Sequence, residues 1–171
     1  GKVATPFATV MRELFPPGSP RSAVLDFFGH RAPYETIKHW RLGYAPAEWR
    51  ALYTHMSQLG FSTEILLKAG LAKPQAKPAR LSGGGEPYDV FRDRIIFPLK
   101  DQGGRTIAFS GRALAKETEP KYLNSPDTPV FTKHEVLYGL DKAKDKIRRK
   151  DYAVLVEGQM DVLHAHQAGF Q

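Results

Sequence analysis

A pair of carboxylates near the end of the chain has the spacing and setting of a metal site. Glu157 follows the apolar run 152–156, and Asp161 comes four residues later with Gly158 between them. The run is typical of a strand buried on both faces of a parallel sheet, and the glycine allows a tight turn into a helix. Ligands of open α/β sheets lie beyond the strands' carboxyl ends, and paired carboxylates can hold Mg²⁺. The alternative is that Glu157 ends a strand and Asp161 caps a helix, with no metal.

The charge is divided along the chain as a nucleic-acid polymerase would need. All 25 lysines and arginines and 15 of the 18 acidic residues lie in residues 1–150, whereas residues 151–171 hold three acids and no lysine or arginine. A basic body can bind a template backbone, and an acidic end can bind metal. The alternative is that a net charge of +7 is ordinary surface charge.

Composition excludes several classes of protein. The 171 residues suit one domain or one and a half, and 42% hydrophobic residues suffice for a core. No apolar run is long enough to cross a membrane and no signal-like start is present, so we expect a soluble protein without a membrane anchor. The absence of cysteine excludes disulfides and thiolate zinc sites. The abrupt ends at Gly1 and Gln171 suggest a piece of a longer protein.

The first half of the chain predicts helices that end at prolines or glycines and form a compact helical cap. Their ranges are 3–15, 24–28, 33–40, 47–59 and 63–69, the last with Ser62 as its N-cap. We interpret Trp40, Trp49 and Tyr53 as core residues, although such side chains can also stack on bases. Residues 42–46 are predicted to form an extended turn, and residues 73–87 a loop.

The second half begins with strands and returns to helix. Residues 94–100 and 105–110 predict two strands joined by a hairpin turn at 101–104. A short strand at 121–124 and a helix at 137–149 precede the carboxylate pair. The cations in the last turn of that helix favour its C-terminal dipole, which explains them without a DNA contact.

Several sequence blocks recur in one known family in this order and spacing. They are Leu42-Gly-Tyr-Ala-Pro46, Tyr88-Asp-Val-Phe-Arg-Asp-Arg-Ile-Ile-Phe-Pro98, Gly111-Arg112, Pro120-Lys-Tyr-Leu-Asn-Ser-Pro-Asp-Thr128, Leu137-Tyr-Gly-Leu140 and Val156-Glu-Gly-Gln-Met-Asp161. From about residue 33 to residue 170 the chain therefore resembles the RNA-polymerase domain of bacterial replicative DNA primases of the DnaG type. The Lys-Tyr-Leu-Asn-Ser-Pro block is specific to primases, whereas Glu-Gly-x-x-Asp alone is a weak signal.

The resemblance implies synthesis of short RNA primers from ribonucleoside triphosphates on single-stranded DNA. In such enzymes a Toprim fold supplies carboxylates for Mg²⁺ or Mn²⁺, which implies that Glu157 and Asp161 are catalytic and metal-binding. It also implies a basic groove for template or nucleotide. The residues that match this groove are Arg94, Arg112, Lys121, Tyr122, Asn124 and Lys133. Among them Lys121 and Lys133 fit best.

The chain departs from the family pattern at several positions. Gln159 stands where tyrosine is usual, Thr132 where histidine is common, and residues 108–111 where the turn is usually richer in glycine. We expect three family parts to lie outside these 171 residues: the zinc ribbon, the rest of Toprim with its Asp-x-Asp pair, and the C-terminal domain that binds the replicative helicase. We therefore expect no zinc, weak affinity for metal and no primer synthesis by this chain alone.

Two other hypotheses stay open. One is a non-catalytic module that binds single-stranded nucleic acid, and the other is a piece of a Toprim nuclease or topoisomerase, which the Lys-Tyr-Leu-Asn-Ser-Pro block disfavours. For the fold we predict a mixed α/β chain. It comprises an N-terminal helix and linker (1–19), a basic helical and mixed-sheet subdomain (20–134), and the start of a Toprim-type α/β sheet (135–171). Without the later strands of that sheet, residues 150–171 are expected to be poorly ordered or to pair with another molecule.

Overall fold

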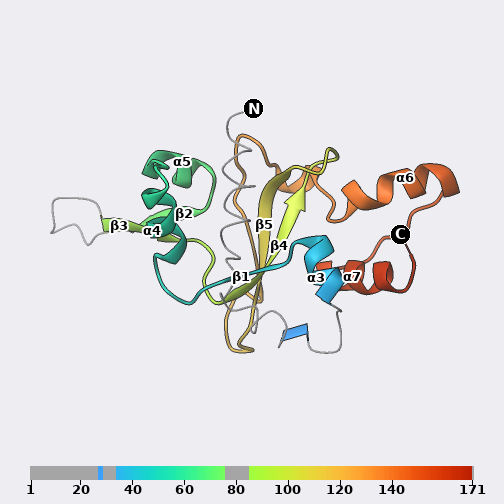
Figure 1. Cartoon of the computed structure of the whole chain (residues 1–171), viewed down its shortest axis with the longest axis horizontal. Coiled ribbons are helices and arrows are strands. Elements are labelled where there is room, and N and C mark those ends of the chain that lie inside the picture. Colours follow the sequence, from blue (N-terminus) through green and yellow to red (C-terminus); the bar gives the residue numbers. More distant parts are fainter. Residues whose placement is uncertain (1–26, 29–33, 76–84, 171) are drawn as a thin grey trace.

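Four antiparallel strands form the central sheet, and helices pack against both of its faces (Figure 1). The computed structural model describes residues 27–28, 34–75 and 85–170. The strand order is β1-β4-β5-β6. The strands are β1 (Gly43–Ala45), β4 (Arg94–Lys100), β5 (Thr106–Ala113) and β6 (Tyr122–Asn124). The predicted mixed α/β fold class is confirmed.

The β4–β5 hairpin forms where the sequence predicted it. The two strands pair from Arg94 opposite Ala113 to Lys100 opposite Thr106. In the turn, Asp101 Oδ1 accepts a hydrogen bond from Arg105 N at 2.9 Å, so the side chain stabilises the reversal. The predicted short strand is also present, as β6, which pairs with β5.

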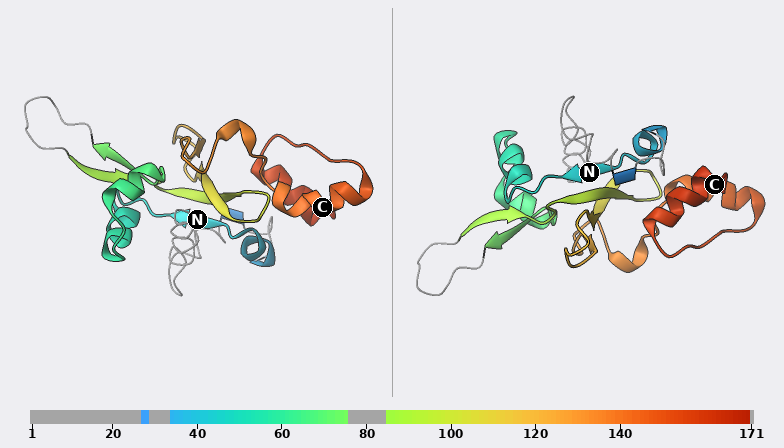
Figure 2. Two further views of the ribbon diagram at one scale, coloured as in Figure 1. Left: turned by 90° about the horizontal axis from the view of Figure 1, so that it is seen from above. Right: turned by 90° about the horizontal axis from the view of Figure 1, so that it is seen from below.

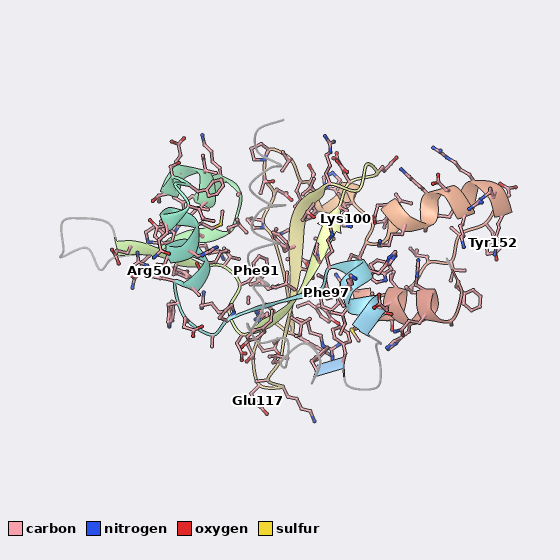
Figure 3. All side chains as sticks on the ribbon, in the orientation of Figure 1. Arg50, Phe91, Phe97, Lys100, Glu117 and Tyr152 are labelled. Carbon is pink, nitrogen blue, oxygen red and sulfur yellow. The ribbon has the colours of Figure 1, made fainter. Side chains whose placement is uncertain are left out.

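The two faces of this sheet bury different helices. Because side chains alternate along a strand, Ile95 and Phe97 lie on one face and Ile96 on the other. The first face packs against α3 (Tyr34–Trp40) and α7 (Gln159–Gln167), and the second against α4 (Ala51–Gln58) and α5 (Thr63–Lys68). Figure 3 shows Phe97 toward α3 and Phe91 toward α4. The predicted single helical cap is therefore wrong, because the helices bury their apolar sides on opposite faces.

Helix boundaries follow local capping chemistry where a cap is present. Ser62 Oγ accepts from Ile65 N at 3.4 Å, as predicted for the N-cap of α5. α6 (Leu140–Lys150) begins three residues later than predicted, because Gly139 has a φ of +83° at its N-cap. A Cβ at Gly139 would also lie 3.0 Å from Val162 Cγ1. α4 likewise begins at Ala51 rather than 47.

The predicted helix 3–15 and most of the helix 24–28 lie outside the described residues, although Phe27 and Phe28 are helical. Among the helices that the structure describes, none is both long and apolar enough to cross a membrane.

Three short strands lie where the sequence predicted a turn or a loop. Residues 43–45 form the edge strand β1, with Tyr44 opposite Ile95. Within the predicted loop 73–87, β2 (Ala72–Gln75) pairs with β3 (Gly85–Asp89). Short strands such as these depend on their partners more than on their own pattern, so their sequences carry little signal. Viewed from above and below, β2 and β3 lie with α4 and α5 at one end of the molecule, and α6 lies with α7 at the other (Figure 2).

The predicted buried strand at 152–156 is wrong for the described part of the chain. These residues are assigned to no strand, and Leu155 and Val154 are 82% and 58% exposed. Figure 3 shows Tyr152 at the outer end of α6. An apolar run becomes a strand only when other strands hydrogen-bond to it, and none among the described residues does. The helix that follows the run is nevertheless packed against the sheet.

Candidate nucleic-acid and metal site

Glu157 and Asp161 lie around one turn at the start of α7, as their spacing predicted. The Gly158 carbonyl accepts a hydrogen bond from Val162 N at 3.1 Å. The Asp161 carboxylate folds back over this turn, because its Oδ2 lies 3.4 Å from the place where a Cβ on Gly158 would sit. Both acidic side chains are exposed. Two exposed carboxylates are suitable ligands for Mg²⁺, but no group of three or more potential metal ligands comes together within the described ranges.

Packing and hydrogen bonds hold α7 against the sheet. Leu163 is fully buried and Met160 is 9% exposed, and both belong to the core cluster that contains Ile95 and Phe97. At the start of the helix, Gln159 Nε2 donates to Ser110 Oγ on β5 at 3.2 Å. The helix thus buries its own apolar side in the core.

Arg112 and Tyr122 form a polar pair on neighbouring strands. They are register partners in β5 and β6, and Arg112 Nη1 donates to Tyr122 Oη at 3.1 Å. The Arg112 guanidinium carbon lies 5.6 Å from the centre of the Tyr122 ring and 5.1 Å from that of Phe27. Aromatic contact with the guanidinium restrains the side chain.

Arg94, predicted as a contact for nucleic acid, is buried instead. It is 5% exposed, and its Nη1 donates to the carbonyls of Pro120 at 2.7 Å and Gly111 at 3.3 Å. Burial and the nearby Arg92 lower its pKa. These bonds join the start of β4 to the residue that precedes Lys121. The geometry therefore favours a role in positioning Lys121 over direct contact with a phosphate.

The remaining predicted contacts are exposed. Lys121, Asn124 and Lys133 are all open to solvent. The backbone N–H of Lys133 donates to Asp127 Oδ1 at 3.0 Å, which fixes the loop between β6 and the short 3₁₀ helix η2 (Lys133–Glu135). Within the described part of the chain, neither lysine ammonium has an ion-pair partner. Their binding to nucleic acid stays a prediction.

Sequence reasoning missed an exposed aromatic and cationic cluster at the other end of the molecule. Trp49, interpreted as a core residue, is 63% exposed, whereas Trp40 is indeed buried. The Arg92 guanidinium carbon lies 4.4 Å from the centre of the Trp49 ring and 5.2 Å from that of Tyr88. The sequence offered one signal, the place of Arg92 in one of the family-like blocks, whereas Trp49 fell inside the predicted helix 47–59 and lies just before α4 in the structure.

The buried Asp89 carboxylate holds this cluster in place. Its two oxygens accept hydrogen bonds from the backbone N–H groups of Leu52 and Tyr53 at 2.7 and 2.8 Å. Its own backbone N–H donates to the Trp49 carbonyl at 2.8 Å. Burial raises the pKa of Asp89, although the two hydrogen bonds oppose that shift. Asp89 therefore ties the start of α4, and with it Trp49, to the end of β3.

Comparison with known proteins shows the family. Residues 18–144 match the model of the DNA primase catalytic core, N-terminal domain. The chain is 45% identical to the DNA primase of Synechococcus elongatus over 86% of its own length and 21% of that protein's.

Solved structures agree with the sequence match. A DNA primase domain from Pseudomonas aeruginosa is 36% identical, with a TM-score of 0.81 over 98% of this chain and 51% of that one. The RNA polymerase domain of Mycobacterium tuberculosis primase DnaG, solved with a double-stranded DNA oligomer with a 6-nucleotide overhang, is 30% identical. Its TM-score is 0.78 over 90% of this chain and 46% of that one. This chain therefore belongs to the DNA primase family and contains the N-terminal domain of its catalytic core.

Proposed function

We propose that this chain is part of a DNA primase, an enzyme that makes short RNA primers on single-stranded DNA by metal-dependent nucleotidyl transfer. The chain spans about a fifth of the length of its curated relatives, so the activity is proposed for the whole protein. We expect this chain by itself to be inactive, because no third potential ligand joins Glu157 and Asp161 among the described residues.

One observation carries the proposal: the turn that bears Glu157 and Asp161 (the carboxylate turn) is attached to the sheet face that bears the Arg112–Tyr122 pair. Ser110, which binds Gln159, and Arg112 are two residues apart on β5, so their side chains share one face. Tyr122 and Asn124 are their register partners on β6. Acidic groups for a metal and donors for phosphate therefore converge on one side of the sheet.

Within this proposal, Glu157 and Asp161 hold Mg²⁺ or Mn²⁺, both of which prefer oxygen ligands. When bound, such an ion neutralises triphosphate charge and activates the 3′ hydroxyl for in-line displacement. The chain's part is to keep both carboxylates exposed on one short turn.

The cations would hold the nucleic acid and the nucleotide. Arg112 gives one of its donors to Tyr122, which leaves its other guanidinium donors for phosphate oxygens. Lys121 and Lys133 are exposed point charges suited to a backbone, and Asn124 can bind a sugar or a base edge. Arg94 would act through the backbone beside Lys121.

Salt-dependent binding tests the template surface. If this chain neutralises three or four phosphates of a labelled single-stranded DNA, log affinity should fall against log salt with a slope of about −2 to −3. The Lys121→Ala/Lys133→Ala double variant should have a slope shallower by roughly 1.4, because two fewer phosphates are neutralised and fewer counterions are released on binding. Fluorescence anisotropy at several salt concentrations measures both values.

A charge-matched control separates local contact from net charge. Lys38 and Lys68 are exposed lysines on α3 and α5. Their double replacement by alanine removes the same charge and should change the slope much less. Equal slopes for the two double variants would place the template elsewhere on the molecule.

Trp49 provides a second, uncharged test. Stacking of one base on an aromatic side chain contributes about 1–3 kcal/mol, so Trp49→Ala should weaken binding at least about fivefold, with an unchanged salt slope. Trp49→Phe should retain much of the affinity because it keeps an aromatic face. Because Trp49 is 63% exposed, its loss should leave the melting temperature nearly unchanged. Wild-type affinity in Trp49→Ala would exclude this cluster from the template path.

The exposed Trp49–Arg92 cluster also supports a second candidate, a module that binds single-stranded nucleic acid without catalysis. The two candidates differ in the carboxylates. A binding module has no need of Glu157, whereas a primase does.

Further parts of the proposal concern the whole protein. We infer that ribonucleoside triphosphates are its substrates, that it acts in the cytoplasm with the replisome, and that it meets the replicative helicase through a region beyond this chain. We also infer that any structural zinc lies outside the described residues.

A further inference from the structure

Gln159 stands in sequence between the two carboxylates and reaches away from them. It is the first residue of α7, and its Nε2 donates to Ser110 Oγ at 3.2 Å. Ser110 lies in the middle of β5 and is fully buried, between register partners on both neighbouring strands: Phe97 on β4 and Asn124 on β6. The amide thus joins the turn that bears Glu157 and Asp161 to β5, the strand that carries Arg112.

This bond differs in kind from the other contacts of α7. Met160 and Leu163 hold the helix by apolar packing, which is strong but has no direction. A hydrogen bond requires a particular distance and angle, so the amide of Gln159 fixes the rotation and the height of the first turn. That turn determines where both carboxylates point.

The register of the sheet relates the position of this turn to that of Arg112. Arg112 is two residues beyond Ser110 on the same face, and its partner Tyr122 is two residues before Asn124. A strand repeats at a fixed rise, so a turn attached at Ser110 has a defined separation from the guanidinium of Arg112.

We propose that Gln159 is a positioning residue that sets Glu157 and Asp161 relative to the Arg112–Tyr122 pair, with the buried Ser110 hydroxyl as its receptor. The inference rests on the proposed function. It deepens that function, because it assigns a role to the residue that stands between the two carboxylates.

Kinetics of the whole primase that contains this sequence test the role. Gln159→Leu keeps the size of the side chain but removes its donor, and Ser110→Ala removes the acceptor. Each should lower kcat for dinucleotide synthesis about three- to tenfold, which matches the loss of one hydrogen bond and a slight misplacement. Template affinity should change less than about twofold. The double variant should be no worse than either single variant, because both remove the same bond.

The other end of α7 offers a matched control. Gln167 Nε2 donates to Thr36 Oγ1 on α3, also at 3.2 Å. Gln167→Leu therefore removes the same type of bond from the same helix, and it should leave kcat unchanged. A wild-type kcat in Gln159→Leu, an equal loss in Gln167→Leu, or additive losses in the double variant would overturn the proposal.

Hydrogen exchange on this chain separates failure of the inference from failure of the proposed function. The Val162 amide, which donates to the Gly158 carbonyl in the first turn of α7, should exchange faster in Gln159→Leu than in the wild type, and the Ala168 amide, which donates to the His164 carbonyl at the other end, should change less. Unchanged exchange at Val162 would refute the positioning role whatever the protein catalyses. If the wild-type protein makes no primers, the proposed function is wrong, and so is the predicted loss of kcat. The exchange data would still decide whether the bond from Gln159 to Ser110 holds the first turn of α7 in place.

Discussion

Primer synthesis by the whole primase should fall at least about 100-fold when Glu157 is replaced by glutamine. Glutamine keeps the shape of the side chain but cannot carry the negative charge that attracts a divalent cation. Glu157 is exposed, so the substitution should leave the fold intact. Affinity for single-stranded DNA should stay the same or rise slightly, because a charge that repels phosphate is lost. A priming assay and an anisotropy titration on the same preparations measure the two effects.

An exposed glutamate far from α7 provides the control. Glu117 lies on the loop after β5, near one edge of the molecule (Figure 3). Glu117→Gln makes the same chemical change and should leave priming unaltered. If Glu157→Gln primes as well as the wild type, Glu157 has no part in the reaction and the module without catalysis becomes the better description.

Leu163→Ala should destabilise this 171-residue chain by about 2–5 kcal/mol. Leu163 is fully buried in the cluster that contains Ile95 and Phe97, so truncation removes apolar contacts and leaves a cavity between α7 and the sheet. Such a loss is a large share of the roughly 5–15 kcal/mol that stabilises a typical domain. Urea unfolding followed by tryptophan fluorescence measures this loss. The ring centre of the buried Trp40 lies 5.2 Å from that of His166 on α7, so its emission reports the packing of this helix.

The same truncation at Leu155 is the matched control. Leu155 is 82% exposed, so Leu155→Ala should change the free energy of unfolding by no more than about 0.5 kcal/mol. Similar values for the two variants would mean that α7 does not pack on the sheet. The carboxylates would then lack a fixed position relative to Arg112.

The sequence by itself determined those features that depend on neighbouring residues. The hairpin of β4 and β5 follows from two apolar runs with Asp101 and glycines between them, and the start of α5 follows from Ser62. The spacing of Glu157 and Asp161 likewise determined that they share one turn, because a turn into a helix brings residues four apart together. The order and spacing of the family-like blocks also predicted the class of enzyme, since both can be read from the sequence without a structure.

Only the tertiary structure decided which side chains are available for binding. Arg94 and Arg112 are both arginines in family-like blocks, yet Arg94 is buried against two carbonyls and Arg112 is only partly buried, with Tyr122 as its partner. Trp40 and Trp49 were both interpreted as core residues, but only Trp40 faces the core. Trp49 faces solvent. Burial depends on which face of the sheet an element covers, and that is set by residues distant in the chain.

The fate of short apolar segments was also decided by partners rather than by pattern. Residues 43–45 became a strand because β4 offered an open edge, whereas the more strongly apolar run 152–156 found no partner among the described residues. Backbone hydrogen bonds in a sheet are made between segments, so a single segment cannot specify them. The tie between Gln159 and Ser110 joins residues 49 positions apart. It could be found only once the chain was folded.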